Sequence, residues 1–290
     1  MEREKFNSLY NKAFKNVFKE QELSFDEFMS RYNYFNSIEE DRNEQIKINN
    51  ELLELCKIHS LKTGLFLLSI KEDDNNYAIF RGIFNTIAND ILAVIKLALE
   101  GLEYQAYTVL RNLYEISLTL LVIMIDDKKK EEYFKSAKNE NEYSVWRNSF
   151  SHKKLKETIE SYEDSIDQNG NLRFLNKWRD KIYKEYSGFV HNDFFNILMY
   201  SVTHPKTNED NEILNLTLWG KELSRTNKIL TSMADLLFYT DNIFLKIIKD
   251  ENIDFDKESF ISKEKQSRNF WNEGLELTFI LIEYYLEIKD

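Results

Sequence analysis

Apolar residues recur every three or four positions along most of the chain, which is the period of an α-helix with one buried face. No segment alternates apolar and polar residues between hairpin turns in the way that strands do. The spacing therefore predicts an all-α fold, a bundle of long antiparallel helices. The predicted helices span residues 2–36 (one helix or two), 38–70, 77–99, 102–125, 152–166, 172–200 (one helix or a pair broken near Gly188), 214–249 and 263–288.

Polar stretches between these helices are the predicted connections. Gly101 stands where a helix C-cap is expected. The stretch 126–142 is dense in charge and predicts an exposed connection or a short helix, and further loops are predicted at 71–76, 167–171 and 203–211. No Gly/Ser-rich linker divides the chain. We therefore predict a single helical domain over 1–290, with N-terminal helices (1–75), a core bundle (77–200) and C-terminal helices (211–290).

The composition supports the helical prediction and limits the function. The 290 residues include 7 Gly and 1 Pro, against roughly 20 and roughly 15 for average usage, whereas a sheet-rich chain needs both for its turns. The formal net charge of −11 argues against unspecific binding of nucleic acid over the whole surface, although a local groove can still hold RNA. The single cysteine, Cys56, excludes a disulfide framework.

The sequence carries no export or membrane signal. The N-terminus has charges throughout and lacks the apolar region of a signal peptide. The longest apolar run, residues 118–125, is interrupted only by Thr119 and falls short of the ~20 residues that a membrane span needs. Heavy use of Lys, Asn, Ile, Phe and Tyr is typical of AT-rich bacterial genomes. We expect a cytoplasmic bacterial protein with no membrane contact.

Several kinds of site are absent from the sequence. There is no phosphate-cradling glycine loop and no H-E-x-x-H motif, and no histidine has a glutamate three residues before it, as di-iron bundles require. Cys56 and His59 share a helix face but supply only two metal ligands. We interpret them as a buried thiol beside an imidazole at the core edge, and we expect no metal and no cofactor.

A first candidate site combines Arg111 and Glu115 with the distant His191. Arg111 and Glu115 lie four residues apart in a very apolar segment, so they share a helix face and have to be paired if they are buried. If the helix that carries His191 is a neighbour, the arginine holds an anionic ligand, the glutamate orients it and the histidine moves a proton. The residues expected to line this site are Tyr107, Tyr183 and Ser187. The alternative interpretation is a structural ion pair and a hydrogen-bonded core histidine.

These segments resemble a widespread bacterial domain of unknown function over about residues 80–200. That family carries an L-R-x-x-x-E segment, then a connection with a tryptophan, then Y-x-x-x-S-x-x-x-H. The matching residues here are Leu110, Arg111, Glu115, Trp146, Tyr183, Ser187 and His191. The resemblance implies an all-helical fold and brings no established activity.

A second candidate site is the segment Arg147–Asn148 to His152. It is similar to the R-x4–6-H signature of HEPN-type helical ribonucleases, in which an asparagine, aspartate or histidine follows the arginine. The resemblance implies a HEPN-like core and metal-free RNA cleavage across a dimer. The histidine would act as general base on the ribose 2′-hydroxyl, and the arginine would stabilise charge on the phosphate. The alternative interpretation is that Arg147 and His152 are solvated residues at a helix start.

Two functional hypotheses follow from these sites. The first is a bacterial toxin or phage-defence effector, a homodimer that cleaves RNA with metal-independent, HEPN-like chemistry. The second is a non-catalytic sensor or protein-interaction module, whose Arg-Glu-His cluster recognises a small anionic ligand or only specifies helix packing. No motif identifies an antitoxin or a regulator.

Overall fold

The computed structural model describes residues 51–71, 75–136, 146–166, 179–184, 186–187, 202–203, 215–216, 223–250, 253 and 261–289. All of them belong to one compact unit, Asn49–Asp290. The helices predicted over 2–36, and the first part of the one over 38–70, lie outside the described residues. The prediction of a single domain over the whole chain therefore stays a prediction.

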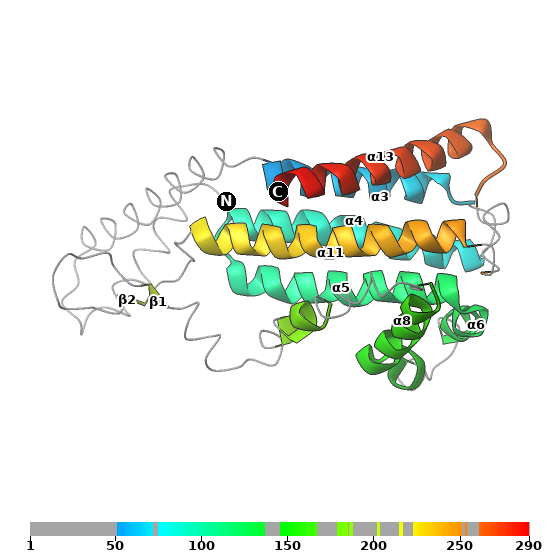
Figure 1. Ribbon diagram of the computed structural model, residues 1–290, viewed down its shortest axis with the longest axis horizontal. Coiled ribbons are helices and arrows are strands. Elements are labelled where there is room, and N and C mark those ends of the chain that lie inside the picture. The colour runs from blue at the N-terminus through cyan, green and yellow to red at the C-terminus, as the bar shows by residue number, and fades with distance from the viewer. Residues whose placement is uncertain are drawn as a thin grey trace, which may run out of the picture. The chain divides into compact units, whose positions relative to one another are not determined.

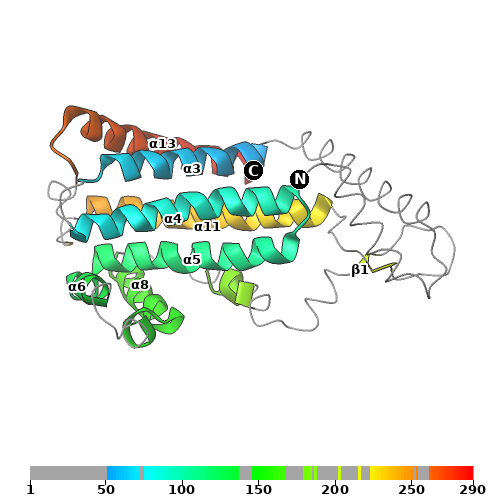
Figure 2. The ribbon, with the colours of Figure 1, turned by 180° about the vertical axis from the view of Figure 1, so that it is seen from behind.

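Four long helices pack into a ring. Each contacts the next, and the last closes against the first (Figure 1). A fifth helix, α13 (Lys265–Lys289), lies on α3 and α11. In both Figure 1 and Figure 2, α4 and α11 lie between the α3 and α13 pair and α5. The predicted all-α fold is confirmed. The four helices of the ring are α3 (Glu51–Ser69), α4 (Asn75–Leu99), α5 (Glu103–Ile125) and α11 (Leu223–Lys249).

One helix departs from the antiparallel order of the bundle. Helices α3, α4 and α5 alternate in direction, but α11 runs parallel to α3 (Figure 1). The Sγ atom of Cys56 lies 3.9 Å from the carbonyl oxygen of Leu230, and further along both helices Lys62 pairs with Asp241. The chain between α5 and α11 therefore returns along the bundle before its fourth helix begins.

The turn between α4 and α5 forms the predicted C-cap. Gly101 has a φ of 79°, the left-handed conformation that glycine adopts without steric cost. Its N–H donates to the carbonyl of Ala98 at 3.2 Å, and the N–H of Leu102 donates to the carbonyl of Leu97 at 2.8 Å. This is the Schellman pattern, which satisfies the last carbonyls of a helix and reverses the chain in a short turn.

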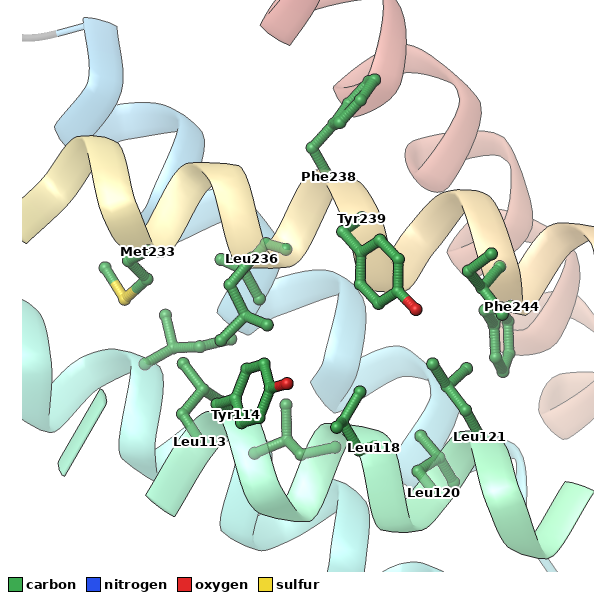
Figure 3. Close-up of a cluster of buried hydrophobic side chains, with 14 of the residues drawn as sticks. Leu113, Tyr114, Leu118, Leu120, Leu121, Met233, Leu236, Phe238, Tyr239 and Phe244 are labelled. Atoms are coloured by element: carbon green, nitrogen blue, oxygen red, sulfur yellow. The ribbon is translucent and has the colours of Figure 1, made fainter. Parts of the chain in front are cut away.

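Part of the core lies between α5 and α11. Figure 3 shows side chains of both helices pointing toward one another, while Phe238 of α11 points to the other side, where its ring stacks on Tyr285 of α13 at 4.3 Å. The four leucines of α5 that carry its 3.6-residue stripe are fully buried, as the sequence predicts. They are Leu110, Leu113, Leu118 and Leu121.

Residues 78–99 and 103–125 are long and apolar enough to cross a membrane by length and composition alone. Their most apolar windows are 39% and 61% buried inside the bundle, and both helices contact α11. Asp90 of α4 accepts a hydrogen bond at 2.6 Å from Asn112 of α5. Buried faces and polar cross-links of this kind are typical of core helices in a soluble protein.

A smaller layer of helices lies against α5. It contains α6 (Asp127–Ser136), the π-helical turn η1 (Trp146–Phe150) and α8 (His152–Ile166). Residues 179–184 and 186–187 are also helical. The charged stretch 126–142 therefore contains a short helix, its residues after Ser136 lie outside the described residues, and α8 has the predicted bounds.

The prediction of a helix from residue 214 is wrong at its start. Two short strands, β1 (Val202–Thr203) and β2 (Asn215–Leu216), pair in antiparallel register, and α11 begins only at Leu223. Strands of two residues are too short to show an alternating pattern, so periodicity could not reveal them.

Candidate functional site

One polar cluster contains members of both predicted sites. Arg111 of the first site, which is paired with Glu115, and His152 of the second both contact Tyr183, where α5, α8 and the helical residues 179–184 come together. We call it the His152 cluster. Its members are Arg111, Tyr114, Glu115, His152, Lys156, Asp180 and Tyr183.

The predicted pairing of Arg111 with Glu115 is confirmed. The Nε of Arg111 donates to Oε1 of Glu115 at 3.0 Å, and the two side chains are 14% and 29% exposed. The guanidinium carbon lies 5.3 Å from the centre of the Tyr183 ring, within cation–π range. The Nη1 atom of Arg111 is buried and has no hydrogen-bond partner. The arginine therefore keeps one donor that its own helix does not satisfy.

His152 is held between two tyrosines. Its ring stacks on Tyr183 with centroids 3.2 Å apart, and its Nε2 lies 3.4 Å from the hydroxyl oxygen of Tyr114. Burial, and to a smaller extent the charge of nearby Lys156, lower the pKa of His152 to about 4, although the Asp180 carboxylate opposes the shift. At neutral pH the imidazole is uncharged and can accept a proton. The interpretation of His152 as a solvated residue holds only in part, because its ring is half-buried and stacks on Tyr183.

Residues 179–184 run antiparallel to α8, and three contacts join the two segments in order. His152 meets Tyr183, and one turn along α8 the Nζ of Lys156 donates to Oδ2 of Asp180 at 2.6 Å. A further turn along, Arg179 reaches Glu160 at 2.9 Å. Of these residues, only Arg179 is fully buried.

Arg179, which makes the last of these contacts, is held by a buried hydrogen-bond network. Its Nη1 donates to Glu163 at 2.8 Å and to the Tyr239 hydroxyl at 3.3 Å, and that hydroxyl donates to the other Glu163 oxygen at 2.6 Å. Burial raises the pKa of Glu163, and the Arg179 charge opposes the rise. Sequence analysis missed Arg179, although the four-residue spacing of Tyr183 and Ser187 leads directly back to it.

Two buried polar atoms beside Arg179 have no hydrogen-bond partner. The Nε of Arg179 and Oδ1 of Asp180 are both buried and unpaired, and they lie 3.8 Å apart. That distance is longer than a hydrogen bond, whose donor and acceptor lie about 2.7–3.2 Å apart. Unsatisfied buried groups are rare in folded proteins, so this pair calls for a physical explanation.

The other predicted residues are placed differently. Tyr107 is fully buried and its ring packs 6.1 Å from that of Tyr186, so it contributes to the core. Ser187 is half-buried, and its hydroxyl has no partner. Asn148 is exposed. His191 and the side chain of Arg147 lie outside the described residues, so their roles stay predictions.

A second polar cluster, which sequence analysis did not predict, is sealed between α3 and α11. Lys62 forms an ion pair with Asp241, and its Nζ lies 3.2 Å from Nδ1 of His59. Burial is the largest influence on His59 and lowers its pKa well below the usual value. The imidazole expected beside Cys56 is therefore fully in the core. Within the described ranges, no three side chains of metal-ligating type come together.

No protein-family model matches the chain, and neither a curated protein nor a solved structure matches it. The resemblance to the domain of unknown function and to HEPN-type ribonucleases therefore remains an interpretation of short motifs. The chemistry of the His152 cluster has to support any function that is assigned.

Proposed function

We propose that the protein is a bacterial toxin or phage-defence effector that cleaves RNA by metal-independent, HEPN-like chemistry. The observation that carries the proposal is that His152, from the R-x4-H segment, stacks on the same Tyr183 ring that Arg111 approaches. A proton acceptor and a guanidinium with a spare donor lie around one aromatic ring. This combination suits a nucleotide, which offers a base to stack and a phosphate to bind.

The reaction would follow from the state of His152. The neutral imidazole takes the proton of a ribose 2′-hydroxyl, and the 2′-oxygen attacks the adjacent phosphorus. The bond from phosphorus to the 5′-oxygen breaks, which leaves a 2′,3′-cyclic phosphate, and the 5′-oxygen takes up a proton from water. Arg111 would stabilise the negative charge that grows on the phosphate.

The resemblance to HEPN-type ribonucleases extends the proposal to the assembly. In that superfamily the Arg and His of two subunits face each other, so we propose a cytoplasmic homodimer in which Arg147 joins the site. Light scattering on the purified protein should then give about twice the chain mass of 34.8 kDa.

Replacement of His152 by alanine tests the function. We expect expression of the wild type to arrest host growth and fragment cellular RNA, and His152→Ala to abolish both effects without unfolding the protein. Lys153→Ala is the matched control, because Lys153 is the next residue on α8 and is exposed. Growth arrest and RNA fragmentation that persist in His152→Ala would contradict the proposal.

The same assay compares the two predicted sites. Loss of activity in His152→Ala and Arg147→Ala, with His191→Ala unaffected, would support the HEPN-like assignment. Loss in His191→Ala alone would return the proton-transfer role to the first site.

A non-catalytic sensor is the competing proposal, and one observation favours it. Arg179, the most buried charge near His152, is bound within the protein by Glu160, Glu163 and Tyr239. Such a network rigidifies a fold and needs no chemistry to explain it. RNA that stays intact in every strain, together with binding of a phosphate-bearing ligand to the purified protein, would favour the sensor.

A further inference from the structure

We propose that the outer face of α3, together with the adjoining face of α13, is a docking surface for a basic amphipathic helix of another protein. The inference goes beyond the proposed function, because α3 and α13 lie on the side of the bundle opposite α8, which carries His152 (Figure 1, Figure 2). Three features of the two helices support it: an apolar row on α3 that no described helix covers, a glycine beside that row, and a row of glutamates on α13.

Helix α3 carries apolar residues on its outer side as well as on the side that packs into the core. Leu61 and Leu68 are 60% and 55% exposed. Together with the half-buried Ile58 and Leu65 they form a row, the α3 row, at alternating spacings of three and four residues. This is the spacing at which two helices pack along a common seam. Because the outer side of a soluble helix is normally polar, a row of this kind marks an interaction site.

Gly64 stands beside Leu61 and Leu68 on this outer side, and the bundle gives no packing reason for a glycine there. A Cβ atom at this position would lie in open space, with nothing but the local helix backbone within 4 Å. Apart from proline, glycine is the least favourable residue in a helix interior, so alanine would suit the isolated chain better. A glycine on a contact face does allow the backbone of a partner to approach closely.

The adjoining face of α13 is acidic. Tyr285 and Trp271 of α13 pack on aromatic rings of α11, so the opposite side of α13 faces outward. That side carries Ile280, which is 50% exposed, between exposed glutamates at the same spacings of three and four residues. From the first of these glutamates to the last, α13 has no other charged residue. They are Glu273, Glu276, Glu283 and Glu287.

An apolar row beside a row of glutamates favours a basic amphipathic helix as the partner. Leucine-like side chains at heptad spacing would pack on the α3 row, and lysines or arginines beside them would pair with the glutamates. Lys57, which is exposed on α3, is already paired with Glu54 at 2.7 Å. A second copy of the chain suits the surface less well. Two-fold pairing of the same face would bring the glutamates of both copies together, and each chain carries a net charge of −11.

Binding of a synthetic peptide to the full chain, measured by fluorescence anisotropy, tests the inference. The probe is a labelled helix of about 18 residues, with leucines at spacings of about three and four residues and lysines beside them. We expect the double variant Leu61→Gln, Leu68→Gln to weaken binding about a hundredfold, because each leucine loses its apolar contact. Glu276→Gln with Glu283→Gln should weaken it about fivefold and reduce its sensitivity to salt. Leu92→Gln, at a leucine of α4 that is 49% exposed, is the matched control and should leave the affinity unaltered.

Gly64→Gln separates docking from folding. Glutamine is a better helix former than glycine and would lie in open space, so the melting temperature should not fall. The larger polar side chain would keep the peptide from close approach, and we expect binding to weaken about tenfold. A glycine needed only for the fold would give the opposite result, a lower melting temperature with unchanged affinity.

The inference is overturned if the wild type does not bind the peptide, if the double leucine variant or Gly64→Gln binds it as well as the wild type, or if a peptide with glutamates in place of the lysines binds as tightly. It is also overturned if light scattering gives the double leucine variant half the mass of the wild type, since a second copy would then occupy the surface. Leu68→Gln alone replaces the double variant if circular dichroism shows that the latter does not fold. His152→Ala should bind the peptide as the wild type does, so the docking surface and the ribonuclease can be refuted separately.

Discussion

Two polar clusters in this molecule are built from the same residue types, a histidine, a lysine one turn later and an aspartate from another helix. In the first, the side chains of Lys62 and Asp241 are only 6% and 5% exposed, and His59 is sealed beside them. In the second, Lys156 and Asp180 are half-exposed around a half-buried His152. The two clusters therefore differ not in residue type but in their access to solvent.

The cost of each cluster follows from the same difference. Charges taken out of water lose their hydration, and a buried ion pair recovers that loss only with good geometry. The Lys62 cluster bears this cost, and no ligand can reach it in the folded bundle. The His152 cluster keeps contact with solvent, so its charges remain available to a ligand. Three predictions test this difference between the two clusters.

The largest expected effect is on the sealed cluster. Lys62→Ala leaves the Asp241 carboxylate buried without its counter-ion, and we expect the free energy of unfolding to fall by about 3–5 kcal/mol in urea titrations. The double variant Lys62→Met, Asp241→Leu removes both charges and should recover most of the loss. If the double variant is as unstable as Lys62→Ala, the cost comes from lost packing and not from the unpaired charge.

A smaller effect is expected at the edge of the His152 cluster. Arg111→Ala breaks a pair that is only partly buried, so the free energy of unfolding should fall by about 1–2 kcal/mol. Lys135→Ala is the control, because Lys135 and Glu131 form an exposed pair with the same four-residue spacing on α6. Urea midpoints should show almost no change for the control. A loss as large as that of Lys62→Ala would mean that Arg111 belongs to the core.

The smallest expected effect is the pH dependence contributed by His152. Its pKa is about 4 in the folded protein and near 6.5 when unfolded, so the unfolded chain binds more protons between these values. The contribution of His152 to the free energy of unfolding is therefore fully present above about pH 6.5, and it is lost as the pH drops toward 4. Solvent screens this half-exposed ring, so its share is on the order of 1 kcal/mol.

Unfolding measured at pH 7 and pH 4.5 isolates the contribution of His152 to the free energy of unfolding. The wild type should lose more stability between the two values than His152→Gln does, whereas His59 contributes equally to both proteins. Equal losses in the two proteins would show that the His152 ring is not buried against Tyr114 and Tyr183.

The fold could be predicted from periodicity because most helices are long and carry one apolar stripe. The apolar period of α5 predicts which of its faces is buried, and Gly101 predicts the turn that follows α4. Spacing of four residues also gave the pair of Arg111 with Glu115. Predictions of this kind succeed because helix geometry alone determines which residues share a face.

Contacts between distant segments could not be predicted in the same way. The sequence offers no sign that His152 meets Tyr183, or that Lys62 meets Asp241, because each contact depends on how separate helices pack. The sequence left His152 open between a catalytic residue and a solvated one, and its stacking on Tyr183 is a packing contact that neither interpretation includes. The four-residue spacing of Tyr183 and Ser187, extended backward, leads to Arg179. Its burial, however, depends on Tyr239 of α11, which is 60 residues further along the chain.

The parallel placement of α11 has a consequence for the way the molecule is made. Contacts such as Cys56 with Leu230 join residues 174 positions apart, and contacts of this range slow folding because a long loop has to close first. The hairpin of α4 and α5 can form as soon as it leaves the ribosome. The Arg179 anchor, in contrast, has to wait for Tyr239 of α11 to be synthesised. The polar network that holds the helical residues beside His152 can thus be completed only after α11 has been synthesised and has packed into the bundle.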